Sequence, residues 1–444
     1  MHFGPIGSLI PAIIHEQFAH NRRAGNMRAV VLFVDISGFT PLAESLMGRF
    51  QDGSQQKGGA EVLGNVVMAI FDPMVSQVAA CGGIIPLFAG DAFAAVFPQT
   101  KAQTELSAAK TAATRALQVV DFIQRYFSDP QNSLRGLRSF QTPYGDFVIG
   151  VKVGLAYGEV AWGIPGGNGR FAHYFRGPAI TQAVRAQALA AVGEAVADPS
   201  ILPHLQGQAQ IRPLAQTDSV CVIPRQRARP FIAPPPPDFS LDEVRPFLSS
   251  VEWLGHDQAE YRQANPVFIA FTPPEDTDRL HQFITAVLQL SEKYGGDFSQ
   301  IDFSIPGGFL VIWFGLPRSY ENNADRALSF LLALKQELGP DSGPTAVPWR
   351  AGVTGGVVWA GLRGGTARCE FGAIGDVVNV AARLAMRAPD YEIWTTQAVY
   401  TAVQARYSFA DLGHLSLKGK RQPQAFYRLL HARRPTSGLQ LERH

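Results

Sequence analysis

The sequence predicts an α+β fold that occurs twice in one chain. Segments of strand length alternate with segments whose apolar residues recur at helical spacing, in the order strand, helix, hairpin, helix, strand, strand, helix. The same order starts again beyond a proline-rich stretch at 224–238. Each series therefore predicts an antiparallel sheet with helices on one face.

An internal repeat supports this division, because the two series match at a constant spacing. Three pairs of residues show the register: Gly154 with Gly352, Gly177 with Gly375, and Arg185 with Arg383. The members of each pair are 198 residues apart, as in 352 − 154 = 198. A match without gaps across a strand, a loop and a helix indicates two copies of one unit, which can pack as a pseudo-twofold pair.

The repeat and the proline-rich break divide the chain into five segments. They are a lead-in with a short helix at 1–28, a first domain at 29–223, a linker and lead-in at 224–264, a second domain at 265–432 and a tail at 433–444. The prolines of the linker oppose regular pairing and favour an extended spacer. A ligand for a proline-binding domain is the alternative interpretation of the same stretch.

Composition limits the classes of partner and compartment. The formal net charge of +2 is too small to argue for nucleic acid or an acidic membrane surface. The three cysteines form no CxxC pair, which argues against a disulfide framework or a zinc site. No apolar run approaches the roughly 18–20 residues that span a bilayer, and the first residues lack the order of a signal peptide. We therefore expect a cytoplasmic protein without membrane or nucleic-acid partners.

The first unit opens on an apolar run at 29–34 that ends in Asp35. A glycine turn follows, and Thr40 as N-cap with Pro41 behind it predicts the start of a helix. A carboxylate can hold a divalent cation, and the free N–H groups at a helix N-terminus can hold phosphate. Taken alone, the stretch is also compatible with an ordinary polar strand end.

A predicted hairpin in the first unit carries a second carboxylate. Its two apolar runs, at 84–89 and 92–97, are separated by Gly90 and Asp91. The other expected elements are helices at 60–80, 103–127 and 178–193 and strands at 147–160 and 171–175. Because the opening strand and the hairpin should be neighbours in the sheet, we expect both carboxylates to face one point. Two such groups suit a Mg²⁺ or Mn²⁺ site.

The second unit repeats the order of elements but not the carboxylates. Its elements are expected at 266–271, 276–293, 299–314, 322–337, 349–359, 369–373, 376–387, 392–395 and 425–430. We align Phe271 and Gly308 with the two carboxylates, so this unit should not bind the same metal. It instead has Asn379 and Arg383, four residues apart on one helix face. The pair suits a sugar or phosphate oxygen and developing charge, and a surface ion pair is the alternative for the arginine.

Three segments resemble the hallmark motifs of the class III nucleotidyl cyclases. They are Phe33-Val-Asp-Ile-Ser-Gly-Phe-Thr40, Phe88-Ala-Gly-Asp91 and Gly375-Asp-Val-Val-Asn-Val-Ala-Ala-Arg383. The resemblance covers roughly 28–223 and 265–430. The tandem arrangement is similar to that of the soluble, bicarbonate-responsive adenylyl cyclases and their bacterial relatives. It implies two ferredoxin-like domains that form an intramolecular pseudo-twofold dimer in a monomeric protein.

The resemblance implies that the first domain holds the metals and the leaving phosphates. Asp35 and Asp91, with the carbonyl of Ile36, would hold two ions of Mg²⁺ or Mn²⁺. The leaving phosphates would be bound by backbone N–H groups of one turn, formed by Gly38, Phe39 and Thr40.

The remaining roles implied by the resemblance belong to basic and amide side chains. Lys152 would bind phosphate, as would Lys418, with Lys420 close enough to leave that choice open. A solvated loop charge is the alternative for either of the last two. Asn379 would orient the ribose, and Arg383 would stabilise charge on the α-phosphate.

The implied reaction is attack of the ribose 3′-hydroxyl of ATP on the α-phosphorus, which gives cyclic AMP and pyrophosphate. Only the cleft between the metal-binding half and the Asn–Arg helix would be active. The other cleft, with Arg185 in place of Arg383, would be inert or regulatory. Two alternatives remain open: a nucleotide-binding regulatory or interaction module that is weakly active or inactive, and a guanylyl cyclase.

The sequence departs from the family pattern where the base is usually read. No lysine lies between Lys293 and Lys335, where adenylyl cyclases usually have one, and Gly372 stands where Asp or Thr is usual. Adenine is therefore favoured by the tandem arrangement and not by base-reading residues. Leu87 replaces the lysine that bicarbonate-responsive cyclases place before the Phe-Ala-Gly-Asp segment, so the sequence leaves a bicarbonate response open.

Overall fold

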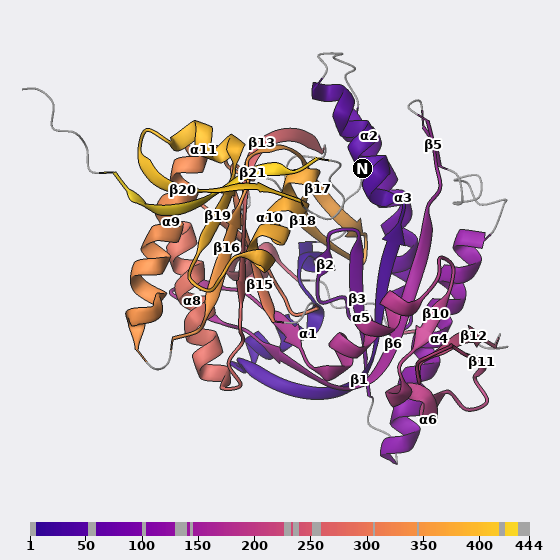
Figure 1. Cartoon of the computed structure of the whole chain (residues 1–444). Coiled ribbons are helices and arrows are strands. Elements are labelled where there is room, and N and C mark those ends of the chain that lie inside the picture. The colour runs from indigo at the N-terminus through magenta and orange to yellow at the C-terminus, as the bar shows by residue number, and fades with distance from the viewer. Residues whose placement is uncertain are drawn as a thin grey trace, which may run out of the picture.

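A computed structural model gives the structure of the chain. It describes residues 6–51, 59–99, 104–128, 140–142, 145–225, 232–233, 239–250, 259–304, 307–343, 346–416 and 422–433. These residues form two halves, each with a large sheet, which lie on the right and on the left of Figure 1. The predicted α+β class with two sheet-containing units is confirmed.

The first half contains an eight-stranded sheet with the order β11-β12-β10-β6-β1-β3-β2 and β9 paired to β6. Its strands are β1 (Ala24–Ser37), β2 (Phe88–Ala89), β3 (Ala92–Pro98), β6 (Gly150–Gly163), β9 (Tyr174–Arg176), β10 (Ala195–Ala197), β11 (Ala209–Pro213) and β12 (Val220–Pro224). Its helices are η1 (Ile6–Leu9), α1 (Ala12–Ala19), α2 (Phe39–Gln51), α3 (Gly59–Ala80), α4 (Glu105–Ser128), α5 (Pro178–Leu189), η2 (Pro199–Ile201) and α6 (Leu202–Leu205). Two small ribbons pair β4 (Phe140–Thr142) with β5 (Gly145–Phe147) and β7 (Gly166–Gly167) with β8 (Arg170–Phe171).

The second half contains a nine-stranded sheet with the order β14-β15-β13-β16-β19-β21-β20, in which β17 pairs with β13 and β18. Its strands are β13 (Glu260–Phe271), β14 (Asp297–Asp302), β15 (Gly308–Phe314), β16 (Trp349–Val353), β17 (Gly356–Gly365), β18 (Arg368–Ile374), β19 (Ile393–Thr396), β20 (Tyr407–Leu415) and β21 (Gln424–Ala432). Its helices are α8 (Thr277–Lys293), α9 (Asn323–Leu338), η5 (Pro340–Ser342), α10 (Asp376–Arg387) and α11 (Gln397–Val403). The short helices α7 (Leu241–Val244) and η3 (Arg245–Phe247) precede this half and pack into a core cluster with α1 and α5 of the first half.

Both faces of the central strand β1 are apolar, so both must be covered. Val30, Leu32 and Val34 pack into one core with α3 and α4, while Val31 and Phe33 pack into another with α5. The expectation of helices on a single face therefore holds for α3 and α4 but not for α5. The helix α5 comes close to the sheet because of a glycine in β6: a Cβ at Gly154 would lie 1.9 Å from the carbonyl oxygen of Ala183.

Helix α3 is the one described helix that is long and apolar enough to cross a membrane by length and composition. Its apolar face, however, includes Val67, Ile70 and Met74, all fully buried in the core beneath the first sheet. A core helix of this kind has the same composition as a membrane span, and its burial here explains its hydrophobicity.

Two predicted boundaries are wrong for local reasons. Helix α2 begins at Phe39, so Thr40 lies inside its first turn and is not the N-cap. The predicted strand at 349–359 is divided into β16 and β17. Pro266 lies in the facing strand β13 and has no N–H to donate, and the two parts of the ladder meet at this residue.

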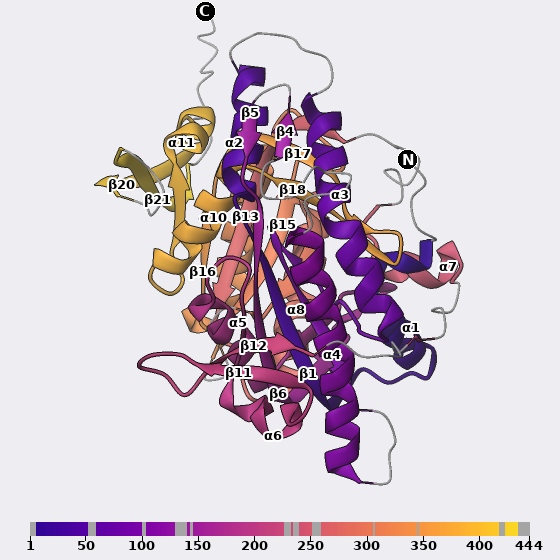
Figure 2. The same cartoon turned by 90° about the vertical axis from the view of Figure 1, so that its right-hand side faces the viewer.

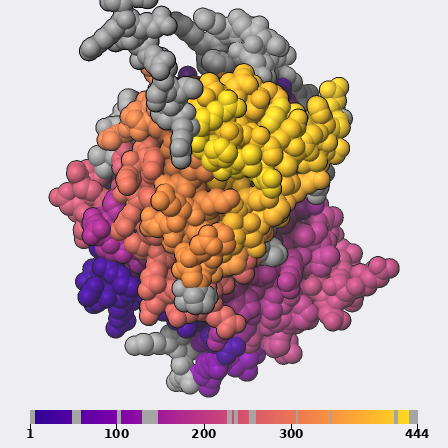
Figure 3. Space-filling model, turned by 60° about the vertical axis from the view of Figure 1, so that its left-hand side comes forward, coloured from indigo at the N-terminus to yellow at the C-terminus, as the bar shows by residue number. Residues whose placement is uncertain are grey.

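The two halves pack directly against each other, as Figures 2 and 3 show from two further directions. Trp359 of β17 is fully buried and its Nε1 donates to the carbonyl oxygen of Ala60 in α3 at 2.9 Å. The Tyr261 hydroxyl donates to the carbonyl oxygen of Leu46 at 3.2 Å. Helices α2 and α3 of the first half are thus held by strands of the second half.

Candidate active site

Asp35 lies near the end of β1, on the sheet face that α5 covers. It pairs with Lys152 of β6 on one side and with Ala92 of β3 on the other. Gln187 of α5 donates from Nε2 to Asp35 Oδ2 at 3.0 Å. Burial raises the pKa of Asp35, while Lys152 and the hydrogen bond from Gln187 act in the opposite direction. The carboxylate is thus partly desolvated and has one positive neighbour.

Asp91 follows a left-handed glycine, Gly90 with φ of 67°, at the tip of the β2–β3 hairpin. The N–H of Ile36 donates to the backbone carbonyl of Asp91 at 3.2 Å, which joins the hairpin tip to the end of β1. The Thr40 hydroxyl donates to Asp91 Oδ2 at 3.4 Å. Burial, and next the negative charge of Asp35, raise the pKa of Asp91 to about 6. The structure therefore brings the two predicted carboxylates into one electrostatic environment.

This environment fits a divalent cation. Two carboxylates that repel each other and are partly desolvated are stabilised when a cation lies between them, and oxygen ligands are those that Mg²⁺ and Mn²⁺ prefer. Among the described residues, no group of three or more His, Cys, Asp or Glu side chains could hold a metal ion by itself. The remaining ligands would have to be backbone oxygen, such as the carbonyl of Ile36, together with water or substrate oxygen.

The turn that follows Asp35 provides free backbone N–H groups. Gly38 has φ of 89°, and a Cβ there would lie 2.1 Å from the carbonyl oxygen of Val148, so this position requires glycine. Helix α2 starts immediately afterwards at Phe39, and the first N–H groups of a helix have no partner within the helix. Phe39 and Thr40 thus begin a helix of 13 residues beside both carboxylates.

A pocket of about 440 Å³ joins this region to the second half of the chain. Residues from both halves line it: Phe39, Thr40, Ala43, Glu44, Gly90 and Asp91 from the first, and Ala373, Ile374, Gly375, Asp376, Val378 and Asn379 from the second. Helix α10 begins at Asp376, directly at the pocket, and Asn379 is solvent-exposed in its first turn. The hairpin tip and the start of α10 therefore face one another.

The other candidate side chains do not line this pocket or lie outside the described residues. Arg383 is partly exposed, one helical turn beyond Asn379, and does not itself line the pocket. Arg185 is exposed on α5. Lys418 and Lys420 lie outside the described residues, so their predicted phosphate contact stays a prediction.

The structure corrects the alignment of the two halves by one residue. Ala270, not Phe271, is the counterpart of Asp35. Ala270 pairs with Arg350, which is 198 residues from Lys152, and it packs with Ala385, which is 198 residues from Gln187. Phe271 corresponds instead to Ile36. Gly308 pairs with Phe271, just as Asp91 is bonded to Ile36, so Gly308 remains the counterpart of Asp91. The second half therefore has no carboxylate at either counterpart position, as predicted.

Aromatic side chains fill the region around these counterpart positions. Phe271 lies 5.8 Å from Phe303, and Tyr174 of the first half lies 5.3 Å from the same ring, between ring centroids. A Cβ on Gly308 would come within 2.4 Å of the Phe271 ring. The Tyr174 hydroxyl also lies 3.2 Å from His281 Nε2. Aromatic rings from both halves therefore pack against one another beside the counterpart positions.

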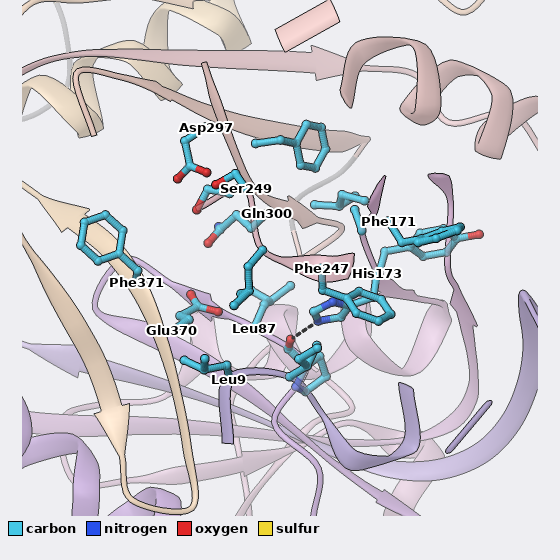
Figure 4. A pocket seen from close by; sticks show the side chains of 18 of the residues that line it. Leu9, Leu87, Phe171, His173, Phe247, Ser249, Asp297, Gln300, Glu370 and Phe371 are labelled. Atoms are coloured by element: carbon cyan, nitrogen blue, oxygen red, sulfur yellow. Dashed lines mark hydrogen bonds between the residues drawn. The ribbon is translucent and has the colours of Figure 1, made fainter. Parts of the chain in front are cut away.

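A second pocket is lined by residues of both halves (Figure 4). Leu87, His173 and Glu370 line it. Burial lowers the pKa of His173 to about 3, so its ring is neutral, and it lies 3.3 Å from the carbonyl oxygen of Pro86. Leu87 lines this pocket with an apolar side chain, at the position where the pattern of bicarbonate-responsive cyclases has a lysine.

Sequence reasoning missed Gln187. It sits inside a predicted helix, where an isolated glutamine carries no functional signal. Its contact with Asp35 arises only because Gly154 lets α5 approach the sheet. The repeat contained one usable sign, since the residue 198 positions later is Ala385.

Two sheet-containing halves with a pocket at their junction form a two-domain α+β architecture. Residues 273–431 match the family described as "Adenylate and Guanylate cyclase catalytic domain". The chain is thus homologous to the class III adenylyl and guanylyl cyclases, as its sequence motifs predicted.

The relatives with the widest coverage are named "Adenylate cyclase type 10". The protein of Homo sapiens is 23% identical over 88% of this chain, and that of Oryctolagus cuniculus is 25% identical over 92%. The chain spans 26% and 27% of the length of these two relatives. An "Adenylate cyclase" of Mycobacterium bovis is 28% identical over 35% of this chain and 35% of its own length.

One solved structure supports the arrangement of both halves. It is a "Class III adenylyl cyclase-like ATP-binding protein from Pseudomonas aeruginosa", which covers 85% of this chain and 85% of its own length with a TM-score of 0.54 and 11% identity. At this identity the likeness establishes the fold alone.

Proposed function

We propose that this chain is a nucleotidyl cyclase with one active cleft, which converts ATP to cyclic AMP and pyrophosphate. The observation that carries the proposal is the pocket in which Thr40, Gly90 and Asp91 of the first half face Gly375 and Asn379 of the second. A metal-binding hairpin and the N-terminus of a helix with an Asn–Arg pair are the two walls that such a reaction needs.

The first half would hold the cations and the triphosphate. Asp35, Asp91 and the carbonyl of Ile36 supply oxygen ligands for Mg²⁺ or Mn²⁺. When bound, such ions would lower the pKa of the attacking hydroxyl and neutralise charge on the phosphates. The N–H groups of the turn at Gly38–Thr40 would donate hydrogen bonds to the leaving phosphates, with Lys152 beside them as a compensating positive charge.

The second half would orient the sugar. Asn379 would donate to or accept from the ribose, which places the 3′-oxygen in line with the α-phosphorus. The 3′-hydroxyl gives its proton to water as a bond forms between the 3′-oxygen and the α-phosphorus. The bond from the α-phosphorus to the bridging oxygen breaks, and pyrophosphate leaves with the electron pair. Arg383 would stabilise the charge that develops on the α-phosphate, and Lys418 would contact the phosphates.

Adenine as the base and a single-chain, cytoplasmic enzyme are parts of the same proposal. Support for adenine comes from relatives named adenylate cyclase that match across both halves of the chain. Support for a monomer comes from the pocket itself, because both of its walls belong to one polypeptide.

The test is to incubate the purified chain with Mn²⁺ and either ATP or GTP and to separate the products by chromatography. We expect cyclic AMP from ATP, and no product from a chain with both Asp35→Asn and Asp91→Asn. Cyclic GMP as the main product would overturn the choice of base. No product with either nucleotide would overturn the assignment as an enzyme.

A nucleotide-binding module without catalysis is the second candidate. Gly372 favours it, since a glycine provides no side chain to read the base, and the solved structure with the same two-half fold is described as an ATP-binding protein. Calorimetric titration with ATP separates the two candidates: tight binding of ATP together with no cyclic product would support the module.

A further inference from the structure

The hairpin that carries Asp91 is held from outside by the second half of the chain. Strand β2 is the last strand in the order of the first sheet, so its outer edge has no strand partner among the described residues. Glu370 of β18 accepts the N–H of Phe88 at Oε1, at 3.3 Å. Arg363 of β17 donates from Nη2 to the carbonyl oxygen of Phe88 at 3.0 Å. Two opposite charges thus replace the missing strand.

The same arginine reaches the residue before Asp91. Arg363 Nη1 donates to the carbonyl oxygen of Gly90 at 3.3 Å. Its guanidinium is 3% exposed and is paired with Glu370 Oε1 at 2.8 Å and with Gln300 Oε1 at 3.0 Å. A buried, fully charged group with several fixed acceptors has little freedom to move. The backbone around Asp91 therefore follows the position of β17 and β18.

This contact also explains an unusual residue in the second half. A Cβ on Gly372 would lie 2.9 Å from Nε and 3.0 Å from Cζ of Arg363. The guanidinium lies flat over the glycine, so a side chain at 372 would push it away from the hairpin. Glycine at this position thus leaves room for the Arg363 guanidinium, whatever the base that the cleft accepts.

We propose that Arg363 and Glu370 are positioning residues that fix the hairpin of Asp91 and thereby set the affinity of the first half for its divalent cation. This inference rests on the proposed function, because it takes Asp35 and Asp91 as the cation ligands. Neither residue touches the cation or the nucleotide. They act through the backbone of Phe88 and Gly90.

The expected size of the effect follows from similar outer contacts. Residues that orient metal ligands typically change metal affinity by about 10–100-fold when they are removed. Arg363 holds two carbonyl groups within three residues of the ligand Asp91, so we expect its effect to lie in this range. Glu370 holds one N–H group of the hairpin and positions Arg363.

The experiment measures binding of Mn²⁺ alone by electron paramagnetic resonance of the free ion, with no nucleotide present. We expect Arg363→Met to weaken Mn²⁺ binding by about 10–100-fold, since methionine keeps the apolar stem but has no donors. Gln300→Ala is the matched control, because Gln300 accepts a hydrogen bond from Arg363, and among the described residues no hydrogen bond joins it to the hairpin. This variant should bind Mn²⁺ within about threefold of the parent chain.

Hydrogen exchange provides a second readout that a general loss of stability would not imitate. In Arg363→Met we expect faster exchange of the Phe88 amide and its neighbours at 87–92, with unchanged exchange in α4. Gly372→Ala tests the same contact without removing a charge, and it should weaken Mn²⁺ binding in the same direction. Should Arg363→Met not fold, this variant carries the test.

The outcomes separate this inference from the proposed function. Mn²⁺ affinity unchanged in both Arg363→Met and Gly372→Ala would overturn the inference, even if the chain makes cyclic AMP. Weakened Mn²⁺ binding in these variants would support it, even if the parent chain makes no cyclic product and the proposed function fails.

Discussion

The same patch of sheet occurs once in each half of the molecule, with opposite chemistry. In the first half Asp35 contacts Gln187 and lies beside Lys152. In the second half the corresponding residues are Ala270, Ala385 and Arg350. The backbone that presents them is the same: a long strand, an antiparallel neighbour and one helix across the face. These changes, together with Gly308 in place of Asp91, separate a candidate metal site from an ordinary apolar contact.

The comparison also shows what a functional site costs a fold. Asp35 and Asp91 are desolvated and have raised pKa values, so their charged forms are disfavoured in the folded chain. Ala270 instead packs with Phe309 and Ala385, all buried. Tyr174 and Phe271 belong to a separate buried cluster with α8 and α9. The counterpart positions of the second half thus make apolar contacts, while the first half retains unfavourable charges that a cation would compensate.

The largest expected effect comes from exchanging the two patches. Asp35→Asn should lower cyclase activity by about 10³-fold, because loss of a ligand costs several kcal/mol of charge stabilisation at roughly 1.4 kcal/mol per factor of ten. Steady-state production of cyclic AMP with Mn²⁺ measures it. The matched change Ala270→Asp should leave activity intact and lower the melting temperature. Retention of a tenth of the activity in Asp35→Asn would contradict the assignment.

The two arginines at the 198-residue spacing come next. Arg383→Ala should reduce kcat by about 10²–10³-fold, the usual loss when a group that stabilises transition-state charge is removed. Arg185→Ala should leave basal activity unchanged. Arg185 lies on α5, and the counterpart positions of the second half, Ala270 and Gly308, carry no carboxylate. The kcat of each variant comes from initial rates across a range of ATP concentrations. Equal losses in the two variants would mean that both clefts contribute.

A smaller effect is expected on stability without metal. Because the pKa of Asp91 is raised to about 6, its carboxyl binds a proton more tightly in the folded than in the unfolded chain. The free energy of unfolding therefore falls as the pH rises from about 4 to about 6, by up to about 3 kcal/mol at 1.36 kcal/mol per pH unit.

Asp91→Asn should consequently raise the melting temperature at pH 8 in the presence of a chelator. The same change should abolish the stabilisation that Mn²⁺ gives to the parent chain. Thermal unfolding followed by circular dichroism at pH 4 and pH 8 measures both. A lower melting temperature for Asp91→Asn at pH 8 would show that the charged carboxylate of Asp91 does not destabilise the folded chain.

The smallest expected effect belongs to Gln187. Gln187→Ala removes the hydrogen bond to Asp35 Oδ2, which raises the pKa of that carboxyl further. We expect about tenfold weaker Mn²⁺ binding, because the hydrogen bond no longer orients the Asp35 carboxylate. Titration of both chains with Mn²⁺ tests it. The counterpart Ala385→Gln should have no effect on Mn²⁺ binding.

Much of the fold could be predicted, because its elements have strong local signals. Helix α10 was predicted with its observed bounds of 376–387, since apolar residues such as Val380 and Leu384 recur at helical spacing after a glycine. The hairpin at Gly90 was predicted from its glycine and the flanking apolar runs. The family was predicted from motifs that combine such elements in a fixed order.

What could not be predicted depends on register and on contacts between the halves. Phe271 was aligned one position away from its place because a single strand offers no local measure of register, and only pairing with β16 provides one. Arg363 and Glu370 bind the backbone of Phe88 and Gly90, which lie about 280 residues earlier in the chain. Neither residue belongs to a motif, so single-sequence reasoning had no reason to select it.

The pocket shared by Asp91 and Asn379 has a kinetic consequence, because both belong to one polypeptide. The effective concentration of one wall around the other is set by the connecting chain and does not depend on the amount of protein in solution. Turnover per molecule should therefore stay constant on dilution, whereas a cyclase assembled from two separate subunits would lose activity. A cell that doubles the amount of this chain would then double its output of product, with no threshold for assembly.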